Sequence, residues 1–263
     1  MNKGFSRKYL GIPYFIFLIV FVVMPLLVIL YYAFTDSTGH FSVFNIVRFF
    51  TDPNTLGTLV YSMGLAFATT LVCLCIAYPT AYILAKSSWK GKKVLILIMV
   101  MPMWINFTLR ITALKEILTL FEGNLAFHPF LNSVIGMTYD FLPFMILPLY
   151  TTLSRMDKSL LEAASDLGAD DFIAFWKVTF PLSIPGVISG ISMVFLPAMT
   201  NYVVLDMVYN STYIMGSLIG SYFSAYDWHG GSMISLVLLI IIGVSSMFTN
   251  NDVETGTRGG SLL

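Results

Sequence analysis

Charged residues are scarce in this sequence. Asp, Glu, Lys and Arg make up 11% of its 263 residues, less than half of the roughly 25% found in soluble domains. Hydrophobic residues make up 57%, and the mean hydropathy is +0.82. Several apolar runs approach the roughly 20 residues that span a bilayer as a helix. The composition therefore predicts an all-α integral membrane protein. Its net charge of zero argues against nucleic acid as a partner.

Motifs for nucleotide binding, metal binding and catalysis are also missing. No GxxxxGK[ST] or HExxH sequence occurs, so the chain lacks the loop that cradles nucleotide phosphates. His40, His128 and His229 lie far apart, and Cys73 and Cys75 have neither redox nor zinc spacing. The sequence predicts no enzyme, no metal and no cofactor in this chain. Any ATP and Mg²⁺ would be bound by another subunit.

Long apolar runs predict six transmembrane helices in one domain that covers residues 1–263. The first run contains no charge and is longer than the apolar core of a signal peptide, which predicts a retained span. The six predicted spans cover residues 12–34, 59–84, 94–114, 134–154, 182–204 and 232–248.

The placement of Lys and Arg predicts the orientation of these spans. With the amino terminus in the cytoplasm, only Arg48, Arg110 and Lys115 fall outside, and eleven basic residues fall inside. This bias predicts that both termini are cytoplasmic. The inner residues are Lys3, Arg7, Lys8, Lys86, Lys90, Lys92, Lys93, Arg155, Lys158, Lys177 and Arg258.

A polar segment, EAASDLGADDFIAFWKVTFP, separates two of these runs on the predicted cytoplasmic side. Ser159 and Glu162 have the S-x-x-E spacing of a capping box at a helix start. Gly168 can adopt the left-handed conformation that ends a helix, and Asp170 or Asp171 can cap a second helix. The aromatic residues that follow suit a membrane interface. The segment over residues 159–181 therefore predicts a short helix, a glycine turn and an interfacial helix. A solvated connector without a partner is the alternative.

This segment resembles the EAA motif of ABC-importer permeases, which has the form E-A-A-x-x-x-G, nine residues, then I-x-L-P. Val178 and Phe180 stand at the Ile and Leu positions. The resemblance implies a coupling helix that docks on a cytoplasmic ATPase and transmits its motion to the spans. The coupling residues it implies are Glu162, Ala163, Ala164, Asp166, Gly168 and Pro181.

A wider resemblance covers most of the chain. The stretches MPMWINFTLRITALKEIL, LPFMILPLYTTLSRMDKSLLEAASDLGA and LPAMTNYVVLDMV are similar to the PotB-type permeases of spermidine/putrescine importers. This resemblance implies the MetI-like transmembrane domain of a type I importer in the bacterial inner membrane, working by alternating access. It also implies a second permease, two ATPase subunits and an extracytoplasmic polyamine-binding protein as partners.

Candidate residues for the substrate path lie in the outer halves of the predicted spans. A polyamine requires carboxylates for its ammonium ends and aromatic faces for its methylene chain. Aspartates at membrane depth often mark a cavity or a partner. Belt anchoring or core packing is the alternative for the aromatic residues, and an interfacial position is the alternative for the aspartates. The candidates are Trp104, Arg110, Tyr139, Asp140, Tyr202 and Asp206, with Tyr209 as a further aromatic residue.

Arg110 does not suit a cationic substrate. A charge at membrane depth is costly, so we expect Arg110 to reach the interface or to pair with Asp140, Asp206 or Glu116. Without the resemblance, it would favour an anionic substrate in the same architecture. An ion-coupled secondary transporter also stays open, although no convincing internal repeat is present.

Overall fold

A computed structural model describes the chain over residues 11–258, including its side chains except at residue 93 and residues 245–258. The described residues are almost entirely helical, and their one β-bridge joins Thr35 to Phe41. The predicted all-α class is therefore confirmed. Lys3, Arg7 and Lys8, on which the predicted orientation partly depends, lie outside the described residues.

The chain divides into two compact units, and each is described by itself. The first comprises the residues up to Thr58 together with Ser217–Ile241, and the second comprises Leu59–Gly216 together with the residues from Ile242 onward. This division into compact units does not test the prediction that residues 1–263 form one domain, which stays a prediction.

The first unit joins the first apolar helix to the start of the last helix. Asn45 donates hydrogen bonds to the carbonyls of Ala33 and Thr35, at 3.1 and 3.0 Å. Arg48 Nη1 lies 3.0 Å from Asp227 Oδ2 in an exposed ion pair. Its helices are α1 (Ile12–Leu18), η2 (Ile19–Val23), α2 (Met24–Ala33), α3 (Phe44–Thr51), most of α12 (Met215–Ser224) and the first part of α13 (Trp228–Arg258).

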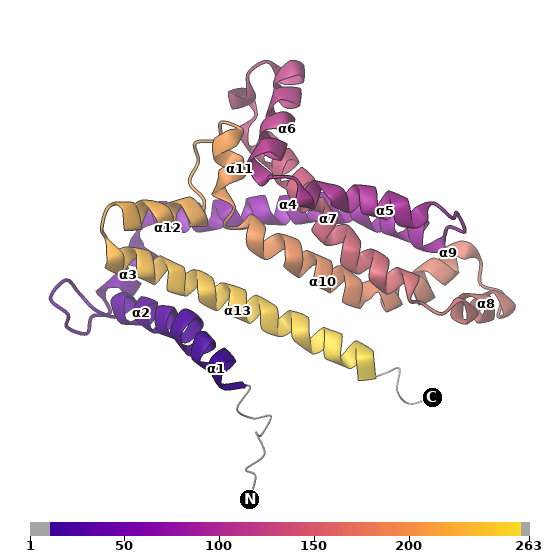
Figure 1. The fold of residues 1–263 in the computed structure, drawn as a ribbon, viewed down its shortest axis with the longest axis horizontal. Coiled ribbons are helices and arrows are strands. Elements are labelled where there is room, and N and C mark those ends of the chain that lie inside the picture. The colour runs from indigo at the N-terminus through magenta and orange to yellow at the C-terminus, as the bar shows by residue number, and fades with distance from the viewer. Residues whose placement is uncertain (1–10, 259–263) are drawn as a thin grey trace, which may run out of the picture. The chain divides into compact units, whose positions relative to one another are not determined.

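The second unit is organised around α7 (Pro129–Ser154) and α10 (Phe180–Ala198), which run side by side (Figure 1). Gly186 and Gly190 of α10 are buried against α7, so the two backbones approach closely. The remaining helices of this unit are α4 (Pro53–Lys86) from Leu59 onward, α5 (Lys92–Val100), η3 (Met101–Trp104), α6 (Phe107–Glu122), η4 (Leu125–Phe127), α8 (Lys158–Asp166), α9 (Asp171–Ala174), η5 (Phe175–Thr179) and α11 (Tyr202–Met207).

Four helical runs among the described residues are long and apolar enough to cross a membrane, and a bent pair of helices would make five. The four runs are Ile12–Ala33, Pro53–Lys86, Pro129–Ser154 and Asp171–Ala198. The last apolar helix, Trp228–Val244, is shorter. Helices thus cover the predicted ranges, but the count of six is approximate. The predicted interfacial helix is not separate from the fifth span, because the helix continues from Asp171 to Ala198.

The third predicted span, 94–114, is not one straight helix. It consists of Val94–Trp104 and Phe107–Glu122, which meet at 103°. Pro102 interrupts the first part, and Ile105 is extended. Asn106 then starts a new helix, since its side chain accepts hydrogen bonds from the amides of Thr108 and Leu109. Pro102 ends the first helix and the polar cap of Asn106, four residues later, starts the second, so the run turns a sharp corner between them.

Two π-helical turns lie within apolar helical runs, and both end two residues before a proline. Val23 ends η2 before Pro25, and Thr179 ends η5 before Pro181. Proline has no N–H to donate to the carbonyl four residues earlier. The wider π-helical turn absorbs this interruption, so each helix continues through its proline.

Candidate functional site

The predicted coupling segment forms an exposed helix and turn between the spanning helices α7 and α10. Asp157, not Ser159, caps α8: its Oδ1 accepts the amide of Ser159 at 3.0 Å. This hydrogen bond from the Ser159 amide lowers the pKa of the exposed Asp157 carboxyl from its ordinary value of 3.8. The predicted capping box is therefore wrong, because the helix begins one residue before Ser159. Glu162 lies past the first turn and is free for another role.

Gly168 ends α8 as predicted, with φ of +82°. Its amide donates to the Ser165 carbonyl at 2.9 Å, and the Ala169 amide donates to the Ala164 carbonyl at 3.0 Å. These two bonds form a Schellman motif. Asp170 then caps α9, since its Oδ1 accepts the amide of Ile173 at 2.7 Å. The turn direction is thus fixed by one glycine and one aspartate.

The coupling residues are open to solvent in this chain. No residue of α8 is buried, and Leu167 at its end is 90% exposed. Glu162, Ala163, Asp166 and Pro181 are exposed and Ala164 is half-buried. The segment has its own internal caps, so its exposed apolar surface is not needed to hold its shape. Such a surface is typical of a docking element.

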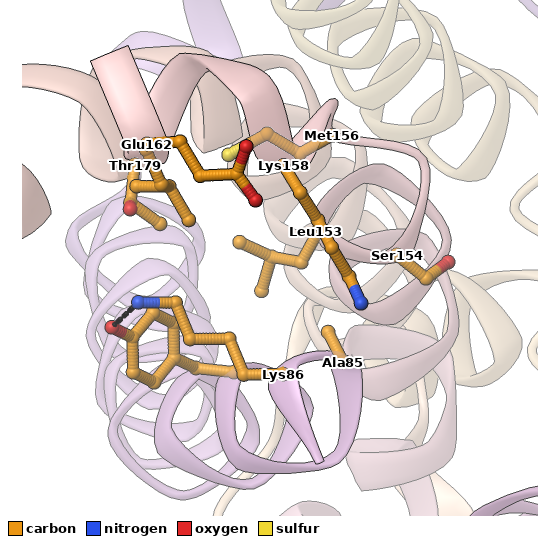
Figure 2. A pocket seen from close by; sticks show the side chains of 10 residues that line it. Ala85, Lys86, Leu153, Ser154, Met156, Lys158, Glu162 and Thr179 are labelled. Atoms are coloured by element: carbon orange, nitrogen blue, oxygen red, sulfur yellow. Dashed lines mark hydrogen bonds between the residues drawn. The ribbon is translucent and has the colours of Figure 1, made fainter. Parts of the chain in front are cut away.

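The glutamate of this segment also lines a cavity of about 270 Å³, between α8 and the ends of α4 and α7. Lys86 and Lys158 stand around the same space (Figure 2). Sequence analysis did not predict this cavity, because its walls come from four separate parts of the chain.

Among the predicted substrate-path residues, Arg110 and Asp140 form a buried ion pair. Arg110 and Asp140 are 7% and 4% exposed, and Arg110 Nη2 donates to Asp140 Oδ1. Arg110 Nη1 donates to the carbonyl of Pro102 at 2.9 Å, and Asn201 Nδ2 donates to Asp140 Oδ2 at 3.3 Å. Of the three partners considered for Arg110, the structure shows Asp140. Both oxygens of this carboxylate are therefore engaged by the protein itself.

This network links four elements around the corner in the third span. Arg110 in α6 holds η3 through Pro102 and holds α7 through Asp140, and Asn201 adds the start of α11. The Tyr139 ring lies 5.8 Å from the guanidinium carbon of Arg110. Asn201 was missed by sequence analysis, although an Asn just before a helix is a common polar cap.

The other substrate-path candidates are exposed and do not join this network. Trp104, 75% exposed, ends η3, and Tyr202 begins α11. Asp206 and Tyr209 line one open cavity of about 280 Å³. Tyr209 also accepts a hydrogen bond from Lys115 Nζ at 2.9 Å. The structure thus separates a paired carboxylate, Asp140, from an open one, Asp206; their roles toward a substrate stay predictions.

An all-helical chain with apolar spans and an exposed helix–turn between two of them has the architecture of a membrane permease. The chain belongs to the family of binding-protein-dependent transport system inner membrane components, whose family model matches residues 77–252. The match includes the coupling segment.

Characterised relatives point to one branch of this family. The chain is 34% identical over 249 residues to the spermidine/putrescine transport system permease protein PotB of Escherichia coli (strain K12), with 86% of this chain and 90% of the relative covered. It is also 34% identical to PotB of Haemophilus influenzae, with 93% and 92% covered.

Solved structures share the fold. A bacterial alginate ABC transporter, crystallised with a periplasmic protein that holds an alginate pentasaccharide, gives a TM-score of 0.72. The identity is 12%, with 93% of this chain and 92% of that chain covered. A second structure of a bacterial alginate importer gives a TM-score of 0.70 at 14% identity.

Proposed function

We propose that this chain is one of two permease subunits in an ATP-driven importer that carries spermidine or putrescine. The identity to PotB over most of the chain supports the cargo class. Two ATPase subunits would supply ATP hydrolysis with Mg²⁺, and an extracytoplasmic binding protein would deliver the polyamine. Both termini and α8 would lie in the cytoplasm.

The observation that carries this proposal is the exposed, internally capped α8 and its turn. Asp157, Gly168 and Asp170 fix the shape of this element, and Leu167 stays exposed on it. The element would therefore move as one rigid body when a partner binds it. Its two ends continue into α7 and α10. Closure of the ATPases would therefore push or pull α7 and α10 together and expose the path alternately to the two sides.

The cargo preference is argued from charge. Asp206 is exposed and lines one open cavity with Tyr209, which offers a carboxylate to an ammonium group. The Tyr209 ring already holds an ammonium, since Lys115 Nζ lies 4.1 Å from its centroid. An anionic cargo was favoured by Arg110, but Asp140 pairs with that arginine. The buried pair removes the main reason for preferring an anion. An ion-coupled mechanism would leave the exposed coupling helix without a use.

Uptake into vesicles tests the proposal. The chain is reconstituted with the proposed partner subunits and supplied with labelled spermidine, putrescine or sulfate. We expect polyamine uptake that requires internal ATP and the binding protein, and no sulfate uptake. Uptake driven by an ion gradient without ATP, or uptake of sulfate alone, would contradict it.

The variant Asp206→Asn tests the cargo site within this experiment. Loss of one charge-assisted contact, worth about 1.5–3 kcal/mol, would raise the apparent KM for spermidine roughly tenfold or more. Glu116→Gln, an exposed acid on α6, serves as the control and leaves the KM unchanged. An unaltered KM in Asp206→Asn would remove this residue from the path.

A further inference from the structure

The cavity beside the coupling helix has the composition of a ligand site. Its volume of about 270 Å³ is close to the lower end of the roughly 300–1,000 Å³ typical of small-molecule pockets. Leu153 and Leu161 provide apolar walls, and Lys86, Lys158 and Glu162 provide charges. Figure 2 shows the three charged side chains around the space beside Leu153, with Glu162 and Lys158 from α8 and Lys86 from α4.

The charged side chains that line this cavity do not form ion pairs with one another. Within the described part of the chain, no ion pair joins Glu162 to Lys86 or Lys158. Lys86 Nζ is held at the wall by Tyr82, to whose hydroxyl it donates at 2.5 Å and whose ring centroid lies 4.6 Å away. An ammonium has three N–H donors, so Lys86 keeps donors for a ligand. Glu162 takes no part in capping α8, as the Asp157 cap shows.

An unsatisfied hydroxyl lies in the same wall. Thr179 is 2% exposed, and its Oγ1 has no hydrogen-bond partner among the described residues. A buried hydroxyl without a partner is destabilising, because its hydrogen bonds to water are lost and not replaced. Thr179 lines the cavity, so a polar ligand there can supply the missing partner after rotation of the side chain.

The position of the cavity along the helices indicates which kind of ligand can enter it. Lys86 is the last residue of α4, and Ser154 is the last residue of α7; both line the cavity. Two helices long and apolar enough to cross a membrane therefore end there, which puts the cavity at or beyond one membrane face. Basic pockets between transmembrane helices at a membrane face bind the phosphates of anionic lipid headgroups. Leu153 and Leu161 would contact the carbons next to the headgroup.

We infer that this cavity binds a phosphate joined to a primary ammonium, as in the headgroup of phosphatidylethanolamine. The phosphate lies between the ammonium groups of Lys86 and Lys158, with the Thr179 hydroxyl as a third donor. Glu162 accepts hydrogen bonds from the ligand's ammonium. A purely anionic headgroup would pair with the two lysines, but it would offer no cation to the Glu162 carboxylate. A zwitterionic headgroup pairs with both, so Glu162 favours a zwitterion.

A bound headgroup would connect α8 to the ends of the spans. Lys158 and Glu162 belong to α8, and Lys86 belongs to α4, so one ligand would bridge both elements. The bridge would hold α8 at a fixed distance from α4 while α8 moves with its partner. Coupling would then depend on the lipid composition, which is a property separate from cargo choice.

Lipid binding can be measured without transport. The full-length chain, purified with its co-expressed partner subunits and stripped of lipid, is mixed with phosphatidylethanolamine, phosphatidylcholine or phosphatidylglycerol of identical acyl chains. Native mass spectrometry then counts the bound lipid. We expect phosphatidylethanolamine to bind about tenfold more tightly than phosphatidylcholine, whose quaternary ammonium has no N–H to donate; this is the lower range for a charged hydrogen bond. Equal binding of all three lipids would overturn the inference, and so would a preference for phosphatidylglycerol.

Three variants assign the roles. The double variant Lys86→Met/Lys158→Met loses the bound phosphatidylethanolamine, and Thr179→Val weakens it. Glu162→Gln removes only the preference over phosphatidylcholine. The control is Lys90→Met, an exposed lysine outside the cavity, which binds as the unaltered chain does. If the lysine variant keeps the lipid but loses an ATPase subunit, the cavity is a protein contact and the inference fails.

Soluble phosphoethanolamine distinguishes the two sources of this chemistry. If it competes with the lipid only at millimolar concentration, the acyl chains contribute and the ligand is the membrane lipid. If it displaces the lipid at the lipid's own concentration, the ligand is the soluble compound. Failure of uptake in the transport experiment would leave this binding result unaffected, so the two proposals fail separately.

Discussion

The α7–α10 pair and the turn after α8 both depend on glycine, for opposite reasons. Gly186 has an ordinary helical backbone, but a Cβ there would lie 2.8 Å from Thr152 Cβ and 3.1 Å from the Pro148 carbonyl. Gly168 has φ of +82° and open space around it, with nothing within 4 Å of an added Cβ. The helix pair therefore needs a residue without a side chain, so that the two helices can approach, and the turn needs a residue that adopts the left-handed backbone conformation.

The charged groups of the packed interior around α7 and those of the coupling segment also differ. The interior uses its charges internally, since Arg110 and Asp140 bind each other, Pro102 and Asn201. In the coupling segment, Glu162 and Lys158 have no such partners among the residues that the structure describes, and Leu167 is exposed. The interior is built to keep one arrangement, and the segment is built to present groups to something else. Substitutions in the interior should therefore change stability, and those in the segment should change coupling.

Breaking the buried ion pair should have the largest effect. Arg110→Met or Asp140→Leu alone leaves a buried charge without its partner, which costs about 3–5 kcal/mol of unfolding free energy. The double variant removes both charges and should recover most of that loss. The measurement is chemical unfolding in detergent micelles, with the four chains compared as a cycle.

The exposed ion pair Arg48–Asp227 provides the matched control. Its side chains are 47% and 31% exposed, and exposed pairs contribute about 0–1 kcal/mol. Arg48→Met should therefore hardly change the unfolding free energy. Equal losses in Arg48→Met and Arg110→Met would show that burial does not distinguish the two pairs.

Filling the space between α7 and α10 should have the next effect. Gly186→Ala forces a methyl group against Thr152 and a backbone carbonyl, and overpacking of this kind costs about 1–3 kcal/mol. Gly64→Ala in α4 is the control, because no atom lies within 4 Å of its added Cβ. There alanine should stabilise the helix by about 0.5–1 kcal/mol. Loss of stability in both variants would contradict a role for space at Gly186.

Several of these features could be predicted from sequence because each carries a local signal. Gly168 is a single glycine after a helical stretch, and its positive φ followed from that. The cap of α8 was mispredicted, since Asp157 and Ser159 are both good caps two residues apart and S-x-x-E favoured the second. The local sequence is compatible with either cap. Which residue starts the helix depends on how the chain leaves the end of α7.

The corner in the third span and the partner of Arg110 could not be predicted in this way. A proline such as Pro102 favours a bend, but the 103° corner also required Asn106 to cap a new helix. Arg110 had three acidic candidates, and Asp140 lies 30 residues away on another helix. Only the packing of α6 against α7 selects it. The cavity beside Glu162 was missed for the same reason.

Substituting Gly168 should separate coupling from folding. A β-branched residue in a left-handed conformation costs at least about 1–2 kcal/mol, which would re-aim or fray the end of α8. Gly168→Val should abolish ATP-driven uptake in the reconstituted system, with the global unfolding transition little changed. Gly168→Asn is the control, since asparagine tolerates this conformation, and should keep most of the uptake. Unchanged uptake in Gly168→Val would remove the turn from the coupling path.

The cap of α8 should have the smallest effect, and it should depend on pH. The Ser159 amide lowers the pKa of Asp157 below its ordinary value of 3.8, so the charged cap stabilises α8 at pH values above 3.8. This contribution is lost as the pH falls through the lowered pKa. Hydrogen exchange of residues 158–166, corrected for the intrinsic rate, should therefore be faster in Asp157→Ala than in the unaltered chain at pH 6. The two should converge as the pH falls through the lowered pKa, because protonation of the Asp157 carboxyl weakens the cap in the unaltered chain and the alanine variant has no cap to lose. Asp166→Ala, at the other end of the helix, removes a charge but no cap and should show no such convergence; if it behaves like Asp157→Ala, net charge rather than capping governs the segment.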